Sequence, residues 1–596
     1  MAHNIPNEVL INSSQQTKNT ILYQYNKILQ TETIPPQWQH STITTIYKGK
    51  GTKGKCSNER GITLSSNIGK TFERIINNRL IQELNISEAQ AGGIKNRATS
   101  DHIMLLNEIL KTIKPNTPKY LTFLDVTKAF DKAWSDAILY TMNKNGSKDL
   151  NWTITKKLNE DLTAQIRTKH GLTRKITINN SIRQGGVLSG TQYALLMDEI
   201  NKDLTTKNLG IELPKSKIKI PALLWMDDVV LISDSRQEMQ QMLDQTNHTA
   251  KKYHIQFGQA KSETMIIGKG KPDKNFTLGD TTLNTTTKYK YLGVTLNNKN
   301  NLTDHITNIK QKTEAAYQTI LAILQDSNFK GIQLKSAWKL LETCIKPIIT
   351  HSLEALEINK TSMKELNKIW EAFIKRILKT PISTPTESLY IETGLIDIET
   401  TIEQNRLRMA SRLLQSKIQI MQIIKQENIK NGWWENTNKI AQKHDINLED
   451  LQGSKQSINK LIKQKTLTSF HKRITETAKD KSKIQYMLQV NNTWEAGKQQ
   501  PYLNFLTRER ASIIFQTRTR MIKIKTNYKN AHNNTTCRMC KSQEETQQHI
   551  LNECQALHTD NTTKIDPKDL FTQNKHSLNE IAIKIEKILT SISETQ

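Results

Sequence analysis

The sequence predicts an α+β fold, because strand-like and helix-like segments occupy different parts of the 596-residue chain. Between residues 120 and 300, the short apolar runs 120–125, 223–226, 229–232 and 291–296 are flanked by turn-forming or charged residues, as strands are. After residue 300, apolar residues recur with the period of a helix. We therefore expect a mixed part that contains a sheet, followed by a long helical part.

Two of the later helices are predicted in detail. The first begins at Thr303 or Asp304, and its apolar face consists of Ile306, Ile309, Tyr317, Ile320 and Leu324. The second has an apolar face made of Met363, Leu366, Ile369, Trp370, Phe373 and Ile377. Ser362 and Glu365 form a possible capping box for this helix, and Pro381 follows its end.

The chain carries a large excess of positive charge. It has 85 Lys and Arg against 57 Asp and Glu, for a formal net charge of +28. Such an excess favours a polyanionic partner, because phosphates attract Lys and Arg directly. Five cysteines are too few for a disulfide-rich secreted scaffold. No apolar run is long enough to span a bilayer. We expect nucleic-acid partners and no membrane.

Acidic residues lie at the ends of three strand-like runs. Asp125 ends the first run, and Asp227 and Asp228 lie between two others. Adjacent carboxylates among apolar residues repel each other and lose hydration, so we expect them at a hairpin tip. There they could share Mg²⁺ ions with Asp125 from a neighbouring strand, because Mg²⁺ prefers carboxylate oxygens. The other interpretation of the Asp-Asp pair is a simple turn.

A second candidate metal site lies near the end of the chain. Cys537, Cys540, His549 and Cys554 follow the spacing Cys-x2-Cys-x8-His-x4-Cys. Three thiolates and one imidazole suit a closed tetrahedral Zn²⁺ site, and we expect one structural zinc ion here. The alternative is a buried or decayed cysteine cluster that holds no metal.

The acidic segments belong to a series that resembles the palm motifs of reverse transcriptases. Asp125-x4-Phe130, the segment 183–189 and Met226-Asp227-Asp228 have the order and approximate spacing of these motifs. Lys128-Ala-Phe-Asp131 is similar to the non-LTR type of retrotransposon polymerase, the type of the long interspersed elements. Segments upstream and downstream extend the resemblance over most of residues 4–560, including the Cys-Cys-His-Cys cluster.

The resemblance implies a right-hand polymerase, with fingers at residues 1–119, a palm with an antiparallel sheet at 120–300 and a helical thumb at 301–400. A basic helical region at 401–530, a zinc knuckle at 531–560 and a polar tail with one amphipathic helix at 561–596 would follow. We expect the endonuclease domain of complete family members to be missing. Residues 5–10 already match the opening fingers segment, and no restriction-like acidic core follows residue 560.

By the same resemblance, Asp125, Asp227 and Asp228 would be the catalytic carboxylates that hold two Mg²⁺ ions. Six further residues would bind the incoming nucleotide: Lys48, Arg60, Phe130, Gln184, Gly185 and Lys261. Among them, Phe130 would be the steric gate against a ribose 2′-hydroxyl, and Lys261 would donate a proton to the leaving pyrophosphate.

The implied function is an RNA-directed DNA polymerase that extends a DNA 3′ end on an RNA template with deoxynucleoside triphosphates. By family analogy it would act on nicked chromosomal DNA in the nucleus, with a cytoplasmic ribonucleoprotein as the other location. Departures from the family, such as Gly61 where Pro is usual, leave open a catalytically inactive or domesticated nucleic-acid-binding remnant. A group-two-intron maturase is a third hypothesis.

Overall fold

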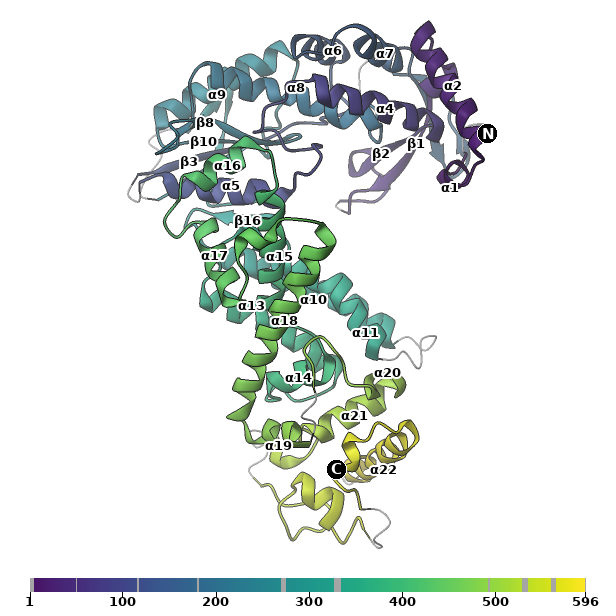
Figure 1. The fold of residues 1–596 in the computed structure, drawn as a ribbon, viewed down its shortest axis with the longest axis vertical. Helices are drawn as coiled ribbons and strands as arrows, with labels where there is room; N and C mark the ends of the chain where they lie inside the picture. Colours follow the sequence, from purple (N-terminus) through teal and green to yellow (C-terminus); the bar gives the residue numbers. More distant parts are fainter. Residues whose placement is uncertain are drawn as a thin grey trace. The chain divides into compact units, whose positions relative to one another are not determined.

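The computed structural model describes residues 5–594 except 50, 115–116, 179–181, 269–274, 326–333, 491–493, 528–533 and 559–563. The chain divides into two compact units (Figure 1). Unit 1 comprises Met1–Leu292, Asn297–Asn300 and Lys417–Ile429, and unit 2 comprises the remainder. Unit 1 mixes sheets with helices and unit 2 is mainly helical, so the predicted α+β class is confirmed. The finer division into six segments stays a prediction.

The central sheet of unit 1 has the strand order β14–β11–β3–β10–β9. Its strands are β3 (Lys119–Asp125), β9 (Ala222–Trp225), β10 (Asp228–Ser233), β11 (Glu263–Ile267) and β14 (Asn284–Thr286). β3 lies between β10 and β11 and is antiparallel to both, and β14 joins the edge in parallel. Because β3 is central, its residues 121–124 are almost fully buried. Three of the predicted apolar runs, 120–125, 223–226 and 229–232, form β3, β9 and β10 of this sheet.

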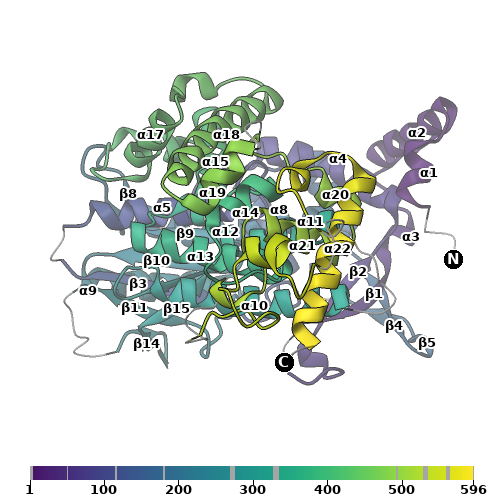
Figure 2. The same cartoon turned by 90° about the horizontal axis from the view of Figure 1, so that it is seen from below.

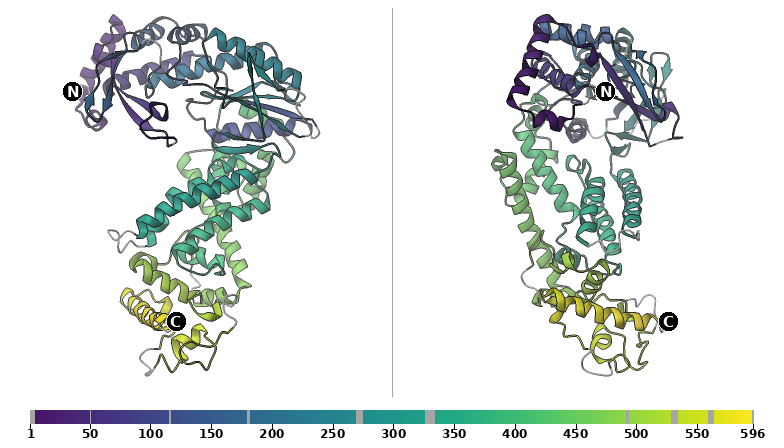
Figure 3. Two further views of the ribbon diagram at one scale, coloured as in Figure 1. Left: turned by 180° about the vertical axis from the view of Figure 1, so that it is seen from behind. Right: turned by 90° about the vertical axis from the view of Figure 1, so that its right-hand side faces the viewer.

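A second sheet of unit 1 is built on a long hairpin, which forms the purple strands in Figure 3. It contains β1 (His40–Tyr47), β2 (Glu59–Leu64), β4 (Thr163–Thr168), β5 (Gly171–Leu172) and β6 (Ile176–Thr177). β1 pairs with β2 in antiparallel and with β4 in parallel orientation. The hairpin therefore carries the predicted nucleotide-binding residues Lys48 and Arg60.

Helices pack around the two sheets of unit 1. They are α1 (Asn7–Ile11), α2 (Gln15–Thr31), α3 (Pro36–Gln39), α4 (Asn67–Glu83), α5 (Thr99–Thr112), α6 (Ser135–Lys144), α7 (Asp149–Asn159), α8 (Val187–Thr206) and α9 (Arg236–Lys252). α8 contacts α4, α6 and α9, and its residues from Thr191 to Asn201 are all buried. α8 is therefore the central helix of this core.

A buried ion pair joins α4 to the start of α8. Arg183 Nη2 lies 2.7 Å from Glu73 Oε1, and the two side chains are only 5% and 3% exposed. The other carboxylate oxygen of Glu73 accepts a hydrogen bond from the backbone N–H of Val187, in the first turn of α8. Such N–H groups have no partner within the helix, so Glu73 both neutralises Arg183 and caps α8.

One short helix of the predicted basic region belongs to unit 1. The segment Lys417–Ile429 contains α16 (Gln419–Gln426), although the chain on either side of it lies in unit 2. The Glu88 carboxylate accepts hydrogen bonds from the backbone N–H groups of Gln419 at 2.7 Å and Ile420 at 2.6 Å. This negative cap at the helix N-terminus attaches α16 to unit 1.

Unit 2 is a helical body in which α15 and α18 run side by side (Figure 2). Its helices are α10 (Thr303–Gln325), α11 (Leu334–Leu340), α12 (Lys346–Thr350), α13 (Lys360–Ile377), α14 (Thr386–Thr393), α15 (Ile398–Leu414), α17 (Trp433–Lys443), α18 (Lys455–Lys479), α19 (Ser482–Val490), α20 (Tyr502–Phe505), α21 (Arg508–Arg518) and α22 (Lys575–Glu594). α22, the yellow helix in Figure 3, packs against α21 and buries Leu578, Ala582 and Ile585.

The two helices predicted in detail are present, with one correction. Every residue of the predicted apolar face of α10 is buried, and so is the face of α13 from Leu366 onward. The cap of α13 is not Ser362. Asn359 caps the helix instead, because its side chain accepts the backbone N–H of Ser362. Because α13 begins at Lys360, Ser362 lies within the first turn of this helix and does not precede it.

The run 291–296 was predicted as one strand, and this prediction is wrong. β15 (Lys288–Tyr291) ends and β16 (Val294–Asn297) begins on either side of Leu292 and Gly293. These two residues have φ values of +45° and +91°, which a strand cannot accommodate.

Within the described parts of the chain, no helix is both long and apolar enough to cross a membrane.

Replacing Glu73 by Ala should lower the free energy of unfolding of unit 1 by about 3 to 5 kcal/mol, because Arg183 stays buried without its partner. Urea denaturation followed by circular dichroism measures the change. Gln82→Ala is the matched control on the same helix. Its side chain is exposed, so we expect a change within about 0.5 kcal/mol. Equal effects of the two substitutions would contradict this role of Glu73.

Candidate functional site

Strand pairing brings the three predicted carboxylates together at one end of the central sheet. Asp228, the first residue of β10, lies opposite Asp125, the last residue of β3. On its other side Asp228 pairs with Trp225 of β9, so that Met226 and Asp227 form the hairpin turn. Acidic residues separated by about a hundred positions in the sequence therefore lie side by side at one end of the sheet. Asp227 therefore lies in a turn, as the other interpretation expects, whereas Asp228 lies in a strand beside a third carboxylate.

A buried glutamine holds this turn in place. Gln90 Oε1 accepts hydrogen bonds from the backbone N–H groups of Met226 at 3.1 Å and Gly92 at 2.9 Å. Met226 adopts a φ of +58°, which is uncommon for a residue with a side chain and costs conformational energy. A Cβ atom on Gly92 would lie 2.2 Å from Met226 N, so only glycine fits against the turn. The segment 90–92 thus positions Asp227.

The carboxylates repel one another, and nearby cations partly offset the repulsion. Burial, followed by the charges of Asp227 and Asp125, raises the pKa of Asp228 to about 6, and Lys261 opposes this rise. Burial and Asp125 also raise the pKa of Asp227, whereas Lys261 and Arg60 lower it. A cation would relieve the repulsion, so the three residues form a suitable set of oxygen ligands for divalent metal ions.

Lys261 is the basic residue in direct contact with this group. Its Nζ atom lies 2.8 and 3.1 Å from the two carboxylate oxygens of Asp125. The Lys261 side chain is 71% exposed, which allows it to leave Asp125 at little energetic cost. A divalent cation on Asp125 would compete with the ammonium group and would release it.

The β1–β2 hairpin carries both predicted triphosphate contacts. Arg60 on β2 is exposed, and its charge acts on Asp227. Lys48 follows β1, and its Nζ atom donates a hydrogen bond to the carbonyl of Ser57 at 2.9 Å, within the same hairpin. The structure thus places Arg60 near the carboxylates, whereas the observed contact of Lys48 is local.

Gln184 and Gly185 lie along the same hairpin. The backbone N–H of Thr63 on β2 donates to the carbonyl of Gln184 at 2.8 Å. Gly185 has a φ of +110°, and a Cβ there would lie 3.0 Å from the Thr63 carbonyl. The backbones approach closely at this point, which requires a glycine. The segment 184–185 therefore extends the surface that carries Arg60.

Phe130 follows β3 in the turn after Asp125, and it is half-buried. Its ring stacks on the ring of Tyr193, with centroids 5.1 Å apart and an interplanar angle of 23°. Core packing and a role as a steric gate are compatible here, because one side of the ring is covered and the residue is still partly exposed. The sequence did not indicate a role for Tyr193, because the residues around it predict only an apolar helix.

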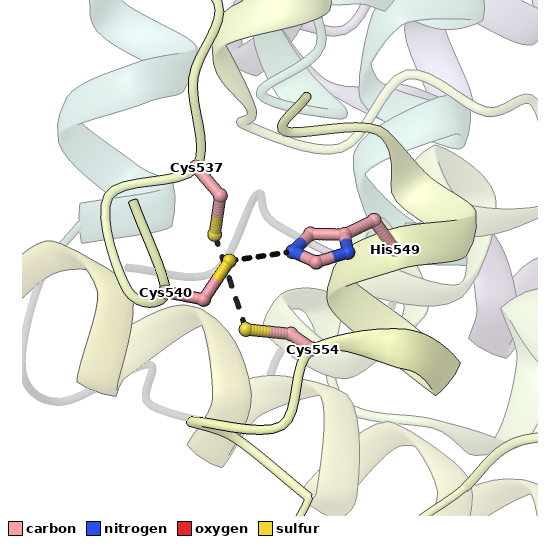
Figure 4. A group of neighbouring side chains, drawn as sticks. All are labelled: Cys537, Cys540, His549 and Cys554. Atoms are coloured by element: carbon pink, nitrogen blue, oxygen red, sulfur yellow. Dashed lines mark hydrogen bonds between the residues drawn. The ribbon is translucent and has the colours of Figure 1, made fainter. Parts of the chain in front are cut away.

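The four predicted zinc ligands converge in unit 2 (Figure 4). Their ligand atoms all lie within 4.8 Å of one another. The Sγ atoms of Cys537 and Cys554 are 3.9 Å apart, and Cys540 Sγ is 3.3 Å from His549 Nε2. With Zn–S bonds of about 2.3 Å, tetrahedral geometry requires sulfur atoms about 3.8 Å apart. The cluster therefore has a spacing that fits a zinc ion.

Hydrogen bonds favour the ionised form of one thiol in this cluster. The side chain of Ser542, with the backbone N–H groups of Ser542 and Gln543, lowers the pKa of Cys540 to about 5. Burial and Cys537 raise the pKa of Cys554 to about 11. A metal ion would stabilise both thiolates, because it binds the deprotonated form.

A buried glutamate that the sequence did not reveal supports the cluster. Glu545 is fully buried, and it accepts hydrogen bonds from the Arg538 side chain at 2.7 Å and from the backbone N–H of Lys525 at 2.8 Å. It also accepts the backbone N–H of Arg538, between Cys537 and Cys540. Glu545 therefore fixes the loop that carries these two cysteines.

Comparison with known proteins agrees with the geometry. Residues 47–296 match the family model described as reverse transcriptase (RNA-dependent DNA polymerase). The "RNA-directed DNA polymerase from mobile element jockey" of Drosophila melanogaster is 23% identical over 359 residues, which cover 58% of this chain and 38% of the relative. The "Retrovirus-related Pol polyprotein from type-1 retrotransposable element R2" of Popillia japonica is 24% identical over 391 residues, which cover 62% and 52%.

Among solved structures, the apo telomerase of Candida tropicalis is similar at 12% identity and a TM-score of 0.32, over 69% of this chain and 73% of that chain.

The chain spans about half or less of the length of the two mobile-element relatives. The matched region includes β2, the central sheet and all three carboxylates. Residues 47–296 are therefore a reverse transcriptase domain, in a chain whose relatives are the RNA-directed DNA polymerases of non-LTR retrotransposons.

Proposed function

We propose that this protein is an RNA-directed DNA polymerase of a non-LTR retrotransposon, which extends a DNA 3′ end on an RNA template. The observation that carries the proposal is the placement of Asp125, Asp227 and Asp228 at one point of a reverse transcriptase domain. A surface turn would not require two carboxylates, Asp227 and Asp228, whose pKa values are raised by burial and by the charge of Asp125. A site for divalent cations explains why such a costly arrangement is present.

In this proposal Asp125 and Asp227 are the main ligands of two Mg²⁺ ions, and Asp228 is the third catalytic carboxylate. When bound, the ions activate the 3′-hydroxyl and stabilise the leaving pyrophosphate. Lys261, which contacts Asp125 in this structure, would donate a proton to the pyrophosphate. Arg60 binds the triphosphate, whose negative charge complements its guanidinium group. Lys48 is a second candidate for this contact.

The surface formed by β2 and the segment 184–185 supports the incoming nucleotide. The backbone hydrogen bond described above holds Gln184 and Gly185 against Thr63. Because Gly185 has no side chain, a nucleotide can approach the main chain there. Phe130 restricts the space beside the sugar and disfavours a 2′-hydroxyl. Its contact with Tyr193 fixes the position of its ring.

The partners follow from the family and from the charge of the chain. The relatives are named as RNA-directed DNA polymerases of mobile elements, which supports an RNA template, a DNA primer and deoxynucleoside triphosphates as substrates. The net charge of +28 favours binding to their phosphate backbones. We propose that the protein acts in the nucleus, where a chromosomal primer would be found.

We also propose that Cys537, Cys540, His549 and Cys554 hold one structural Zn²⁺ ion. The donor set and its spacing support this assignment. His549 would bind through Nε2, the ring nitrogen that faces Cys540. The ion would hold together the loop that contains Cys537 and Cys540 and the short helical segment His549–Glu553, which directly precedes Cys554.

Replacing Asp227 by Asn should reduce primer extension on poly(rA)/oligo(dT) with Mg²⁺ by at least about a thousandfold, because one ligand charge at the reacting centre is lost. Asp244→Asn is the matched control, since Asp244 is an exposed residue on α9. It should retain full activity. Undiminished extension by the Asp227 variant would remove the catalytic assignment, and nucleic-acid binding without extension by the unmodified protein would favour an inactive remnant.

Replacing Phe130 by Val should raise the incorporation of ribonucleotides relative to deoxynucleotides by at least about tenfold, because the smaller side chain leaves room for a 2′-hydroxyl. Single-nucleotide extension with each sugar measures the ratio. Phe276→Val is the control for lost packing, since Phe276 lies in the core of unit 1. If the ratio does not change in the Phe130 variant, this residue is not the gate.

Metal analysis by mass spectrometry of the full chain should find about one zinc ion per molecule. Cys540→Ser should lose most of this zinc, because one of the four ligands is removed. Cys56→Ser is the matched control, since Cys56 is an exposed free cysteine outside the cluster. A chain that carries no zinc, or a Cys540 variant with unchanged zinc content, would rule out the proposed site.

A further inference from the structure

Tyr193 on α8 carries a buried hydroxyl group, and its ring contacts the proposed sugar gate, Phe130. The residue is only 2% exposed, and one face of its ring is covered by Phe130. Within the described residues, the Tyr193 hydroxyl has no hydrogen-bond partner. A buried hydroxyl without a partner costs about 1 to 3 kcal/mol, whereas a phenylalanine would fill nearly the same space without this cost. A tyrosine at this position therefore needs an explanation.

The electrostatic environment indicates what the hydroxyl is close to. Burial first, then the negative charges of Asp227 and Asp125, raise the pKa of Tyr193 well above its ordinary value. The hydroxyl thus stays protonated at neutral pH and remains a hydrogen-bond donor. The groups that influence it are two of the carboxylates proposed to hold metal ions.

We propose that Tyr193 is a positioning residue of the polymerase site: its hydroxyl donates a hydrogen bond, directly or through one water, to Asp125 or Asp227 in the cation-bound state, and its ring holds Phe130. The inference rests on the proposed function and deepens it. Carboxylates that bind a metal are themselves hydrogen-bonded by neighbouring groups, which fix their orientation. One side chain then links the metal ligands to the sugar gate.

The chain offers a matched tyrosine for comparison. Tyr317 in unit 2 is also fully buried and stacks on a phenylalanine, Phe373, with ring centroids 4.6 Å apart. Its hydroxyl likewise has no hydrogen-bond partner within the described residues. The charged groups that act on Tyr317 are Arg376, Glu314 and Arg508, all of unit 2. Tyr317→Phe is therefore the same chemical change in a similar environment.

Removing only the Tyr193 hydroxyl tests its link to the metal ligands. Tyr193→Phe in the full chain should weaken Mn²⁺ binding, measured by electron paramagnetic resonance, by about tenfold, as expected for loss of a partner of a metal ligand. The Mg²⁺ concentration that gives half-maximal primer extension should rise by a similar factor. Discrimination between ribonucleotides and deoxynucleotides should not change, because the ring remains. Tyr317→Phe should alter none of these quantities.

Removing the ring tests the link to Phe130. Tyr193→Leu should raise ribonucleotide incorporation by about tenfold, in the same direction as Phe130→Val. Unchanged Mn²⁺ affinity in Tyr193→Phe would overturn the role of the hydroxyl, and unchanged sugar discrimination in Tyr193→Leu would overturn the role of the ring. If the unmodified protein binds Mn²⁺ but extends no primer, the polymerase function fails, and the comparison of Mn²⁺ affinities still decides the role of the hydroxyl.

Discussion

The register of two antiparallel strands is the constraint on which the candidate site depends. Asp228 lies opposite Asp125 only because β10 pairs with β3 at that register, and the adjacent turn then brings Asp227 to the same place. A shift by one residue would turn the side chains of β10 to the opposite face of the sheet. A shift in one direction would move the charged Asp228 into the fully buried positions of the run from Val229 to Ile232.

Single polar contacts from distant segments hold the surroundings of the site in place. Gln90 fixes the turn that carries Asp227, and Glu73 fixes the segment from Arg183 to Val187 between α4 and α8. Lys261 neutralises part of the charge on Asp125. Burial, and then the charges of Asp227 and Asp125, still raise the pKa of Asp228, and bound cations would favour its ionised form.

The sequence predicted the features that follow from local pattern. Short apolar runs with acidic ends located β3, β9 and β10, and regular spacing located the apolar face of α10 and the four residues of the cysteine cluster. Gln90, Glu73, Tyr193 and Glu545 were missed or given no role, because each acts on a group far away in the sequence or on the backbone. The sequence also did not indicate that α16 belongs to unit 1, because the residue that caps this helix, Glu88, lies 331 residues away.

The central claim is that Asp125 and Asp227 share divalent cations. Anomalous X-ray scattering from crystals of the protein with primer, template, a nucleotide and Mn²⁺ tests it most directly. We predict two Mn²⁺ peaks about 4 Å apart, both within bonding distance of Asp125 and Asp227. Crystals in which an ordered nucleotide and primer are bound but Mn²⁺ lies away from these carboxylates would contradict the account.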